Sequence, residues 1–209
     1  MKSALIGKQV LVVEPDDVLG DSIQEMLMDD TEVEAVSRCR DIKTALELLS
    51  KRAYDFVVME VILPLTPEAA LRSKELEAQR SELRKNDRPQ GMSDEQFLDW
   101  LGSMDEAAVR LRYQIEILDQ ERWLQLDADG GLHLIADWLN LLQARGKIKD
   151  GKVETGVLFM TTLELDKLRE AVSNLGQEWN VKLTTACLSK PVFEEDIVEA
   201  LEELADRLD

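Results

Sequence analysis

Two short runs of apolar residues predict the central strands of a parallel sheet. The first lies in Lys8–Val13 and the second in Tyr54–Glu60, and each holds four apolar residues in succession. Continuous apolar character indicates a strand that is covered on both faces. The second run ends at the carboxylate of Glu60. Open α/β sheets bind ligands just outside the carboxyl ends of their strands, so Glu60 is a candidate functional acid. A solvated charge at a strand end is the alternative interpretation.

Helical and strand-like patterns alternate around these two runs. An acidic turn after Val13 leads into a helix that we expect to end near Leu27. Its inner apolar stripe contains Val18, Leu19, Ile23, Met26 and Leu27. Thr31–Val36 alternates between polar and apolar residues and predicts a second strand, and Ile42–Leu49 predicts a second helix. The resulting β-α-β-α-β order predicts a parallel sheet with helices on both faces.

The last third of the chain continues the same alternation. The patterns predict a helix, a strand, a helix, a strand and a final helix over Leu132–Ala144, Gly156–Thr161, Leu163–Leu175, Lys182–Leu188 and Glu194–Leu208. Together with the first three strands, these elements predict an α/β protein with a doubly wound, five-stranded parallel sheet.

The segment between the third strand and these elements has a different character. Pro67–Lys85 is strongly helical and mostly polar, with a heptad spacing of Ala69, Leu76 and Leu83. Capping boxes at Ser93/Gln96 and Ser103/Glu106 predict further helix starts. The last helix carries a coiled-coil-like seam of Met104, Ala108, Leu111, Ile115 and Leu118. Two long helices joined by a break predict an antiparallel hairpin, whose stripes pack together or form an interface, including that of a homodimer.

Composition and charge narrow the classes of function. The 209 residues carry a formal net charge of −18 without clustered Lys and Arg, so we expect no nucleic-acid partner. The sequence contains no run of about 18 apolar residues, so we expect no membrane span. The N-terminus lacks a secretion signal, and Cys39 and Cys187 imply no disulfide framework, which favours a cytoplasmic location.

Three smaller features favour plain structural interpretations. His133 is the only histidine and stands at a helix start without a phosphotransfer motif around it, so we expect a surface residue. Asp127-Ala128-Asp129-Gly130 lacks the first and last acids of a calcium loop and predicts a turn. Cys187 is interpreted as a small apolar residue rather than a reactive thiol.

Taken in order, the strand ends resemble the receiver domain of bacterial two-component response regulators. The motifs are Glu14-Pro15-Asp16 at the acidic pair, Glu60 with Pro64 at the phosphoacceptor strand, Asp129-Gly130-Gly131-Leu132 at the turn and helix that follow, Thr161 at the switch hydroxyl, and Lys190-Pro191 at the lysine–proline pair. The resemblance implies a flavodoxin-like receiver fold over residues 1–65 and 128–209. Residues 66–127 would then be a helical insertion between the third strand and the third helix.

Three positions depart from the pattern of the family. Glu60 stands where the resemblance implies an aspartate, and the added methylene moves the carboxylate into the space of a phosphoryl group. Pro15 replaces the second acid of the pair, so a magnesium site built from Glu14, Asp16 and Glu60 would be weak. Cys187 replaces the aromatic residue that stands three positions before the lysine in that family.

These departures predict a degenerate receiver, not an enzyme, that acts by protein–protein interaction without turning over phosphate. An ion pair between Glu60 and Lys190 would hold one state, and a signalling partner would bind through the insertion, residues 66–127. We expect no cofactor, with Mg²⁺ left open. One alternative is a stand-alone receiver phosphorylated on Glu60 or Asp16 in the presence of Mg²⁺. Another is an unrelated small-molecule-binding domain with the same sheet architecture.

Overall fold

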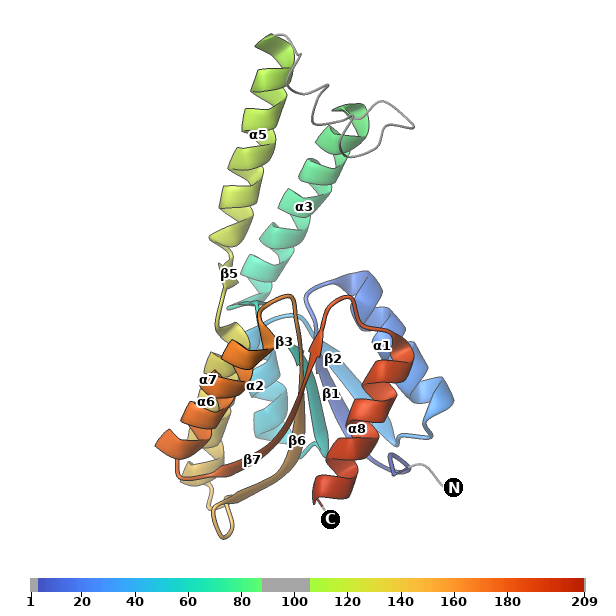
Figure 1. The fold of residues 1–209 in the computed structure, drawn as a ribbon, viewed down its shortest axis with the longest axis vertical. Coiled ribbons are helices and arrows are strands. Elements are labelled where there is room, and N and C mark those ends of the chain that lie inside the picture. Colours follow the sequence, from blue (N-terminus) through green and yellow to red (C-terminus); the bar gives the residue numbers. More distant parts are fainter. Residues whose placement is uncertain (1–3, 88–105, 209) are drawn as a thin grey trace.

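The structure is a computed structural model and describes residues 4–87 and 106–208. Its centre is a five-stranded sheet in which all neighbouring strands are parallel, in the order β2-β1-β3-β6-β7 (Figure 1). The strands are β1 (Gln9–Val13), β2 (Ala35–Cys39), β3 (Phe56–Glu60), β6 (Lys152–Thr161) and β7 (Lys182–Ser189). This is the expected doubly wound α/β fold.

Helices cover both faces of the sheet and form two hydrophobic cores. On one face lie α2 (Ile42–Lys51), α6 (Gly130–Ala144) and α7 (Leu165–Glu178), and on the other lie α1 (Asp17–Asp30) and α8 (Glu194–Leu208). Strand β3 serves both cores, because Val57 and Met59 point to the first face while Phe56 and Val58 point to the second. All four side chains are fully buried, which explains the unbroken apolar run.

A pair of helices projects from the sheet at the end where β3 finishes (Figure 1). A short antiparallel ribbon of β4 (Leu63–Pro64) and β5 (Leu126–Asp127) forms its neck. Above the neck, α3 (Pro67–Asp87) and α5 (Glu106–Trp123) lie side by side as the expected helical hairpin. The capping box at Ser93/Gln96 and the seam residue Met104 lie outside the described residues. Within the described part of the chain, no helix is long and apolar enough to cross a membrane.

Two local predictions were wrong. The second strand is not Thr31–Val36 but Ala35–Cys39, because Glu32 has a positive φ of 53° and the parallel pairing with β1 begins at Ala35. Val18, which the helical stripe placed in the core, is 81% exposed. Its helix begins only at Asp17, so Val18 lies in the first turn and faces the region beneath the hairpin.

Candidate functional site

Three charged side chains meet at the carboxyl edge of the sheet. Glu14 follows β1 directly, Glu60 is the last residue of β3, and Lys190 follows β7. Strand β1 lies between β2 and β3, so the chain reverses its direction of strand addition at this point. Ligands of doubly wound proteins bind at such switch points, where the helices on either side diverge.

The lysine ammonium bridges the two carboxylates. Lys190 Nζ lies 2.7 Å from Glu14 Oε2 and 2.8 Å from Glu60 Oε2. Glu14 is 1% exposed and Glu60 is 7% exposed, so both acids are buried. The ion pair expected between Glu60 and Lys190 is therefore confirmed. Its second acid, Glu14, was expected only as a weak metal ligand. We call Glu14, Lys190 and Glu60 the triad.

Backbone amides occupy the other two carboxylate oxygens of the triad. Glu60 Oε1 accepts hydrogen bonds from the amides of Val61 at 2.6 Å and Ile62 at 3.3 Å. Glu14 Oε1 accepts one from the amide of Asp16 at 3.0 Å. Hydrogen bonding to the charged form stabilises a buried carboxylate, and here each of the four oxygens receives at least one N–H group.

Burial and mutual attraction oppose each other at Glu14 and at Lys190, yet the net effect raises the pKa of both groups. Burial raises the pKa of Glu14, and the nearby Lys190 offsets that effect only in part. Burial alone would lower the pKa of Lys190, but the attraction of Glu14 and Glu60 outweighs it and raises the lysine pKa. The ammonium is consequently held in its charged form between the two acids.

The side chains of two other residues of the expected site, Thr161 and Asp16, accept hydrogen bonds from backbone amides close by in the sequence. Thr161 is fully buried, and its Oγ1 accepts a hydrogen bond from the Leu163 amide at 3.1 Å. Its carbonyl accepts the Lys190 amide at 2.8 Å, which fixes the start of the cis peptide between Lys190 and Pro191. Asp16 is the N-cap of α1, and its Oδ1 accepts the Leu19 amide at 2.9 Å.

This donor set does not fit a divalent cation. Mg²⁺ needs several free oxygen ligands in near-octahedral geometry. Here a lysine ammonium already lies between the Glu14 and Glu60 carboxylates, and Asp16 uses an oxygen to cap a helix. Among the residues that the structure describes, no three His, Cys, Asp or Glu side chains are grouped so as to hold a metal ion.

The triad forms the floor of a cavity of about 600 Å³ whose opposite wall belongs to the hairpin. Ser73, Lys74, Glu77, Arg122 and Trp123 line it from α3 and α5. Between floor and wall, the Asp17 carboxylate binds Lys74 of α3 and two arginines that follow or belong to β2, Arg38 at 3.1 Å and Arg40 at 2.5 Å. Sequence reasoning missed Asp17, because its partners come from two distant segments, the end of β2 and α3, whose proximity no local pattern reveals.

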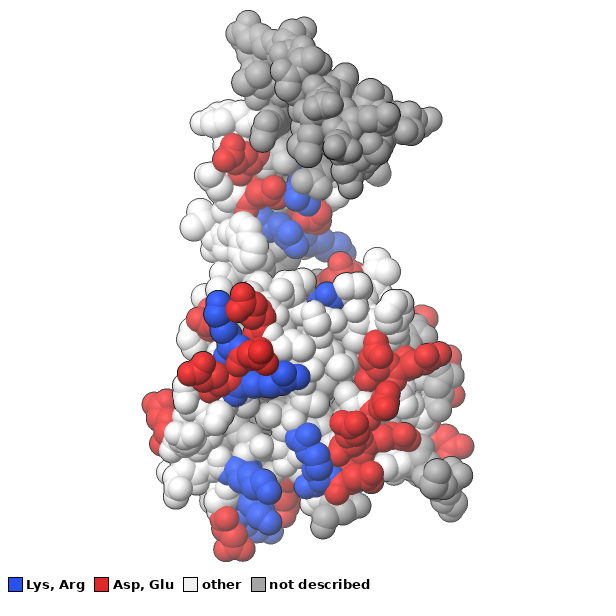
Figure 2. All heavy atoms as spheres, in the orientation of Figure 1, with Lys and Arg blue, Asp and Glu red and all other residues white. Residues whose placement is uncertain are grey.

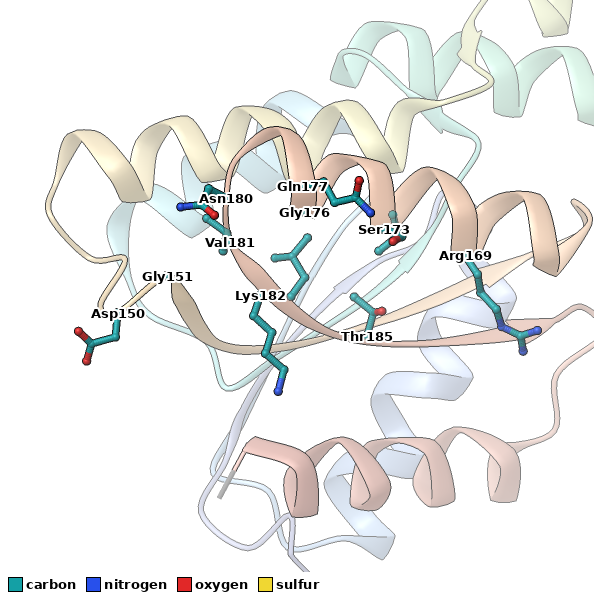
Figure 3. Close-up of a pocket in the computed structure, with 12 residues that line it drawn as sticks. Asp150, Gly151, Arg169, Ser173, Gly176, Gln177, Asn180, Val181, Lys182 and Thr185 are labelled. Atoms are coloured by element: carbon teal, nitrogen blue, oxygen red, sulfur yellow. The ribbon is translucent and has the colours of Figure 1, made fainter.

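A second hollow, of about 740 Å³, lies beside the edge strand β7 and is separate from the triad. Figure 3 shows the residues that line it, among them Arg169 and Gln177 of α7 and Lys182 and Thr185 of β7. It shares no lining residue with the cavity above the triad. Cys187, on the same strand, is half-buried, and burial raises its thiol pKa.

The only histidine of the sequence, His133, is a surface residue, as expected. His133 has a side chain that is 63% exposed, and its Nδ1 lies 2.6 Å from Asp127 Oδ2. This hydrogen bond raises the pKa of His133. The pair joins α6 to the neck of the hairpin, so its place in the fold is structural.

Comparison with known proteins identifies the fold. No protein-family model matches the sequence, and no curated protein matches it. Among solved structures, a two-component response regulator from Clostridium difficile has a TM-score of 0.52 at 11% identity, with 97% of this chain and 98% of that chain covered. A receiver domain of a Francisella response regulator has a TM-score of 0.48 at 14% identity, covering 97% and 99% of the two chains. A receiver domain of an HD domain-containing protein from Pseudomonas fluorescens has 0.48 at 16% identity, covering 96% of each chain. The likeness to the Clostridium difficile response regulator, together with the sheet order β2-β1-β3-β6-β7, shows that the chain has the fold of a response-regulator receiver domain.

Proposed function

We propose that this chain is a pseudo-receiver, a signalling module of a phosphorelay system that acts through protein–protein contacts and does not cycle through a phosphorylated state. The observation that carries the proposal is the position of Lys190 Nζ, 2.7 Å from Glu14 and 2.8 Å from Glu60. The ammonium is a resident cation between the two acids. It offsets one of their two negative charges without a metal ion, and it binds the Glu60 carboxylate, which a phosphoacceptor would need to keep free.

Chemistry at Glu60 would require three changes at once. Attack on a phosphodonor needs a free carboxylate oxygen, yet Oε1 accepts two backbone amides and Oε2 accepts the Lys190 ammonium. A divalent cation would have to enter beside an ammonium that repels it. The lysine would also have to leave both acids in order to bind a phosphoryl oxygen. These costs favour a site that is fixed in one state.

Incubation with acetyl phosphate and MgCl₂, followed by intact-mass measurement, tests this proposal. We expect no gain of a phosphoryl group by the wild-type chain, while a conventional receiver treated in parallel gains one. Calorimetric titration with Mg²⁺ should show no binding in the millimolar range. A phosphoryl gain that Glu60→Gln abolishes would overturn the pseudo-receiver and restore the alternative of a phosphorylated receiver.

The partner surface that we propose is the hairpin. Tyr113 and Ile117 are one turn apart on α5 and are 65% and 36% exposed, and Leu124, the residue that follows the helix, is 82% exposed. Tyr113 and Ile117 share one side of the helix, and together with Leu124 they leave apolar surface open to a partner. We propose no enzymatic activity for the chain, because the charges of the triad are paired with one another.

Affinity capture with the intact chain tests the hairpin as the partner surface. A triple variant, Tyr113→Ser with Ile117→Ser and Leu124→Ser, should lose the protein that the wild type retains. Phe193→Ser is the matched control, because Phe193 is 71% exposed but lies on the sheet domain before α8. Equal capture by the triple variant would exclude this surface.

A further inference from the structure

We propose that the helical hairpin is a hinged cover over the triad and that the ion pair between Asp17 and Lys74 holds the cover in its closed position. This conformational device does not depend on whether Glu60 is ever phosphorylated. It assigns a role to the insertion that is independent of any partner: control of access to the buried charges at the sheet edge.

The anchor on the sheet domain is a carboxylate shared by three cations. Asp17 Oδ1 accepts Arg38 at 3.1 Å and Arg40 at 2.5 Å, while Oδ2 binds the Lys74 ammonium. Arg38 and Arg40 belong to the sheet domain, and Lys74 belongs to α3 of the hairpin. Arg38 is further fixed by Asp21 and by the Asp16 carbonyl at 3.1 Å. The two arginines hold Asp17 in place, so that its remaining oxygen faces the hairpin.

The hairpin moves as one body because ion pairs join its two helices. Arg72 lies 3.2 Å from Glu121, Arg80 lies 2.5 Å from Asp119, and Arg122 lies 3.0 Å from Glu77. The side chain of Leu76 on α3 is also fully buried. Charged contacts at three levels along α3 therefore keep α5 beside it when the pair swings.

The connection to the sheet domain is narrow. The neck pairs only Leu63 with Asp127 and Pro64 with Leu126. Close to it, the Lys43 amide donates to the Leu65 carbonyl at 3.1 Å. A two-residue ribbon permits rotation far more readily than a packed interface does, so a contact placed farther out along α3 controls the angle of the hairpin. Lys74 is such a contact, about two turns beyond the start of α3 at Pro67.

Closure matters because the same cavity has one wall on each body. Glu14, Glu60 and Lys190 line it from the sheet domain, and Ser73 and Trp123 line it from the hairpin. Figure 2 shows charged side chains of both signs where the hairpin meets the sheet domain. Opening would expose the triad to water and to larger molecules, whereas closure leaves a space of about 600 Å³.

Distance measurement between two spin labels tests the cover. One label replaces Gln120 on the exposed side of α5 and the other replaces Glu203 on the exposed side of α8. Cys187→Ala removes the half-buried thiol, and Cys39 is kept because it is buried and its pKa is raised to about 12. The same chain without introduced cysteines checks that Cys39 takes no label.

We expect the parent chain to give one main distance. Lys74→Met removes the charge but keeps the aliphatic stem, and it should increase the ratio of open to closed distances about two- to fivefold, the range for a solvent-accessible ion pair. Lys74→Arg should restore the parent distribution. Lys167→Met is the matched control, because Lys167 is an exposed lysine paired with Glu164 on α7, away from the hairpin.

Three results would overturn the proposal. The first is a Lys74→Met distribution identical to that of the parent. The second is an equal change in Lys167→Met, which would show a general effect of charge. The third is a Lys74→Arg chain as open as Lys74→Met, which would show that the positive charge does not hold the cover. Failure of the pseudo-receiver leaves this readout unchanged, since it reports position and not phosphate.

Discussion

Lys190 and Glu14 lie 176 positions apart in the chain and are joined by a hydrogen bond of 2.7 Å from Nζ to Oε2. Glu14 has 1% of its surface exposed and the Lys190 side chain 16%, so this pair is largely shielded from water. A buried charge is tolerated when it is paired and hydrogen-bonded, and both conditions hold here. The pair connects the ends of β1 and β7, the first and last sheet strands in the chain, across β3, which ends in Glu60, and β6.

Removal of the ammonium should be strongly destabilising. Lys190→Met leaves the Glu14 and Glu60 carboxylates buried without a cation, so we expect a loss of about 3–5 kcal/mol in the free energy of unfolding. Urea denaturation near neutral pH measures this loss. Lys167→Met, at an exposed position, should change the same quantity by less than about 0.5 kcal/mol. The loss in Lys190→Met should shrink in mild acid, where the orphaned acids take up protons, and an unchanged loss there would contradict the assignment.

Lys190 should also make the free energy of unfolding fall at strongly alkaline pH. Its pKa is raised above the ordinary 10.5 in the folded protein, so the folded state binds the proton more tightly than the unfolded state. The resulting contribution is fully present below pH 10.5 and is lost as the pH rises through the folded-state pKa. The difference in unfolding free energy between wild type and Lys190→Met should therefore be flat from about pH 7 to 10 and fall above that. A difference that grows with alkaline pH would show the opposite sign of the pKa change.

Shortening Glu60 should break one side of the bridge. In Glu60→Asp the carboxylate retracts by about 1.5 Å, one carbon–carbon bond, and loses the 2.8 Å contact with Lys190. We expect a loss of about 1.5–3 kcal/mol, the range for a hydrogen bond to a charged group, measured by urea denaturation. Glu47→Asp is the matched control on an exposed i,i+4 pair with Lys51. Stability equal to wild type would mean that the Glu60 carboxylate contributes nothing through the lysine.

A glycine beneath the hairpin should tolerate no side chain. An added Cβ at Gly131 would lie 2.9 Å from the Glu60 carbonyl oxygen and 3.0 Å from Val61 Cα, both backbone atoms. The Gly131 amide also donates to the Val61 carbonyl at 2.8 Å, so α6 cannot move away freely. Gly131→Ala should cost about 1–3 kcal/mol of stability by overpacking, read from thermal or urea unfolding. Asn140→Ala, on the exposed side of the same helix, should be close to neutral, and equal effects of the two would contradict the close approach.

Local sequence patterns predicted most elements of the fold, but they were wrong where the pairing register with a neighbouring strand sets the bounds of a strand. The apolar run before Glu60 is a buried strand because both of its faces are covered, which the pattern states directly. The alternation in Thr31–Val36 fitted a strand equally well, yet pairing with β1 placed β2 at Ala35–Cys39. That shift matters for function, since it brings Arg38 to the end of the strand and to Asp17.

At the functional site, too, some residues were recognised from the sequence, whereas some of their contacts appeared only in the structure. Glu60, Lys190 and Pro191 stood out because they close strands in a known order, and the ion pair between Glu60 and Lys190 followed from the length of the glutamate. Glu14 looked like a metal ligand, because a carboxylate at a strand end has no partner until the last strand is in place. The roles of Thr161 and of the Glu14, Asp16 and Glu60 acids in phosphate or metal chemistry stay predictions.

The sequence by itself determined most of the strands and helices and the order in which acids, hydroxyl and lysine close the sheet, because periodicity and end residues are local properties of the chain. Only the tertiary structure decided that Lys190 bridges two acids and that Asp17 holds Lys74 of the hairpin. Charge pairing depends on distance in space, and strand register and the angle of a narrow neck set that distance.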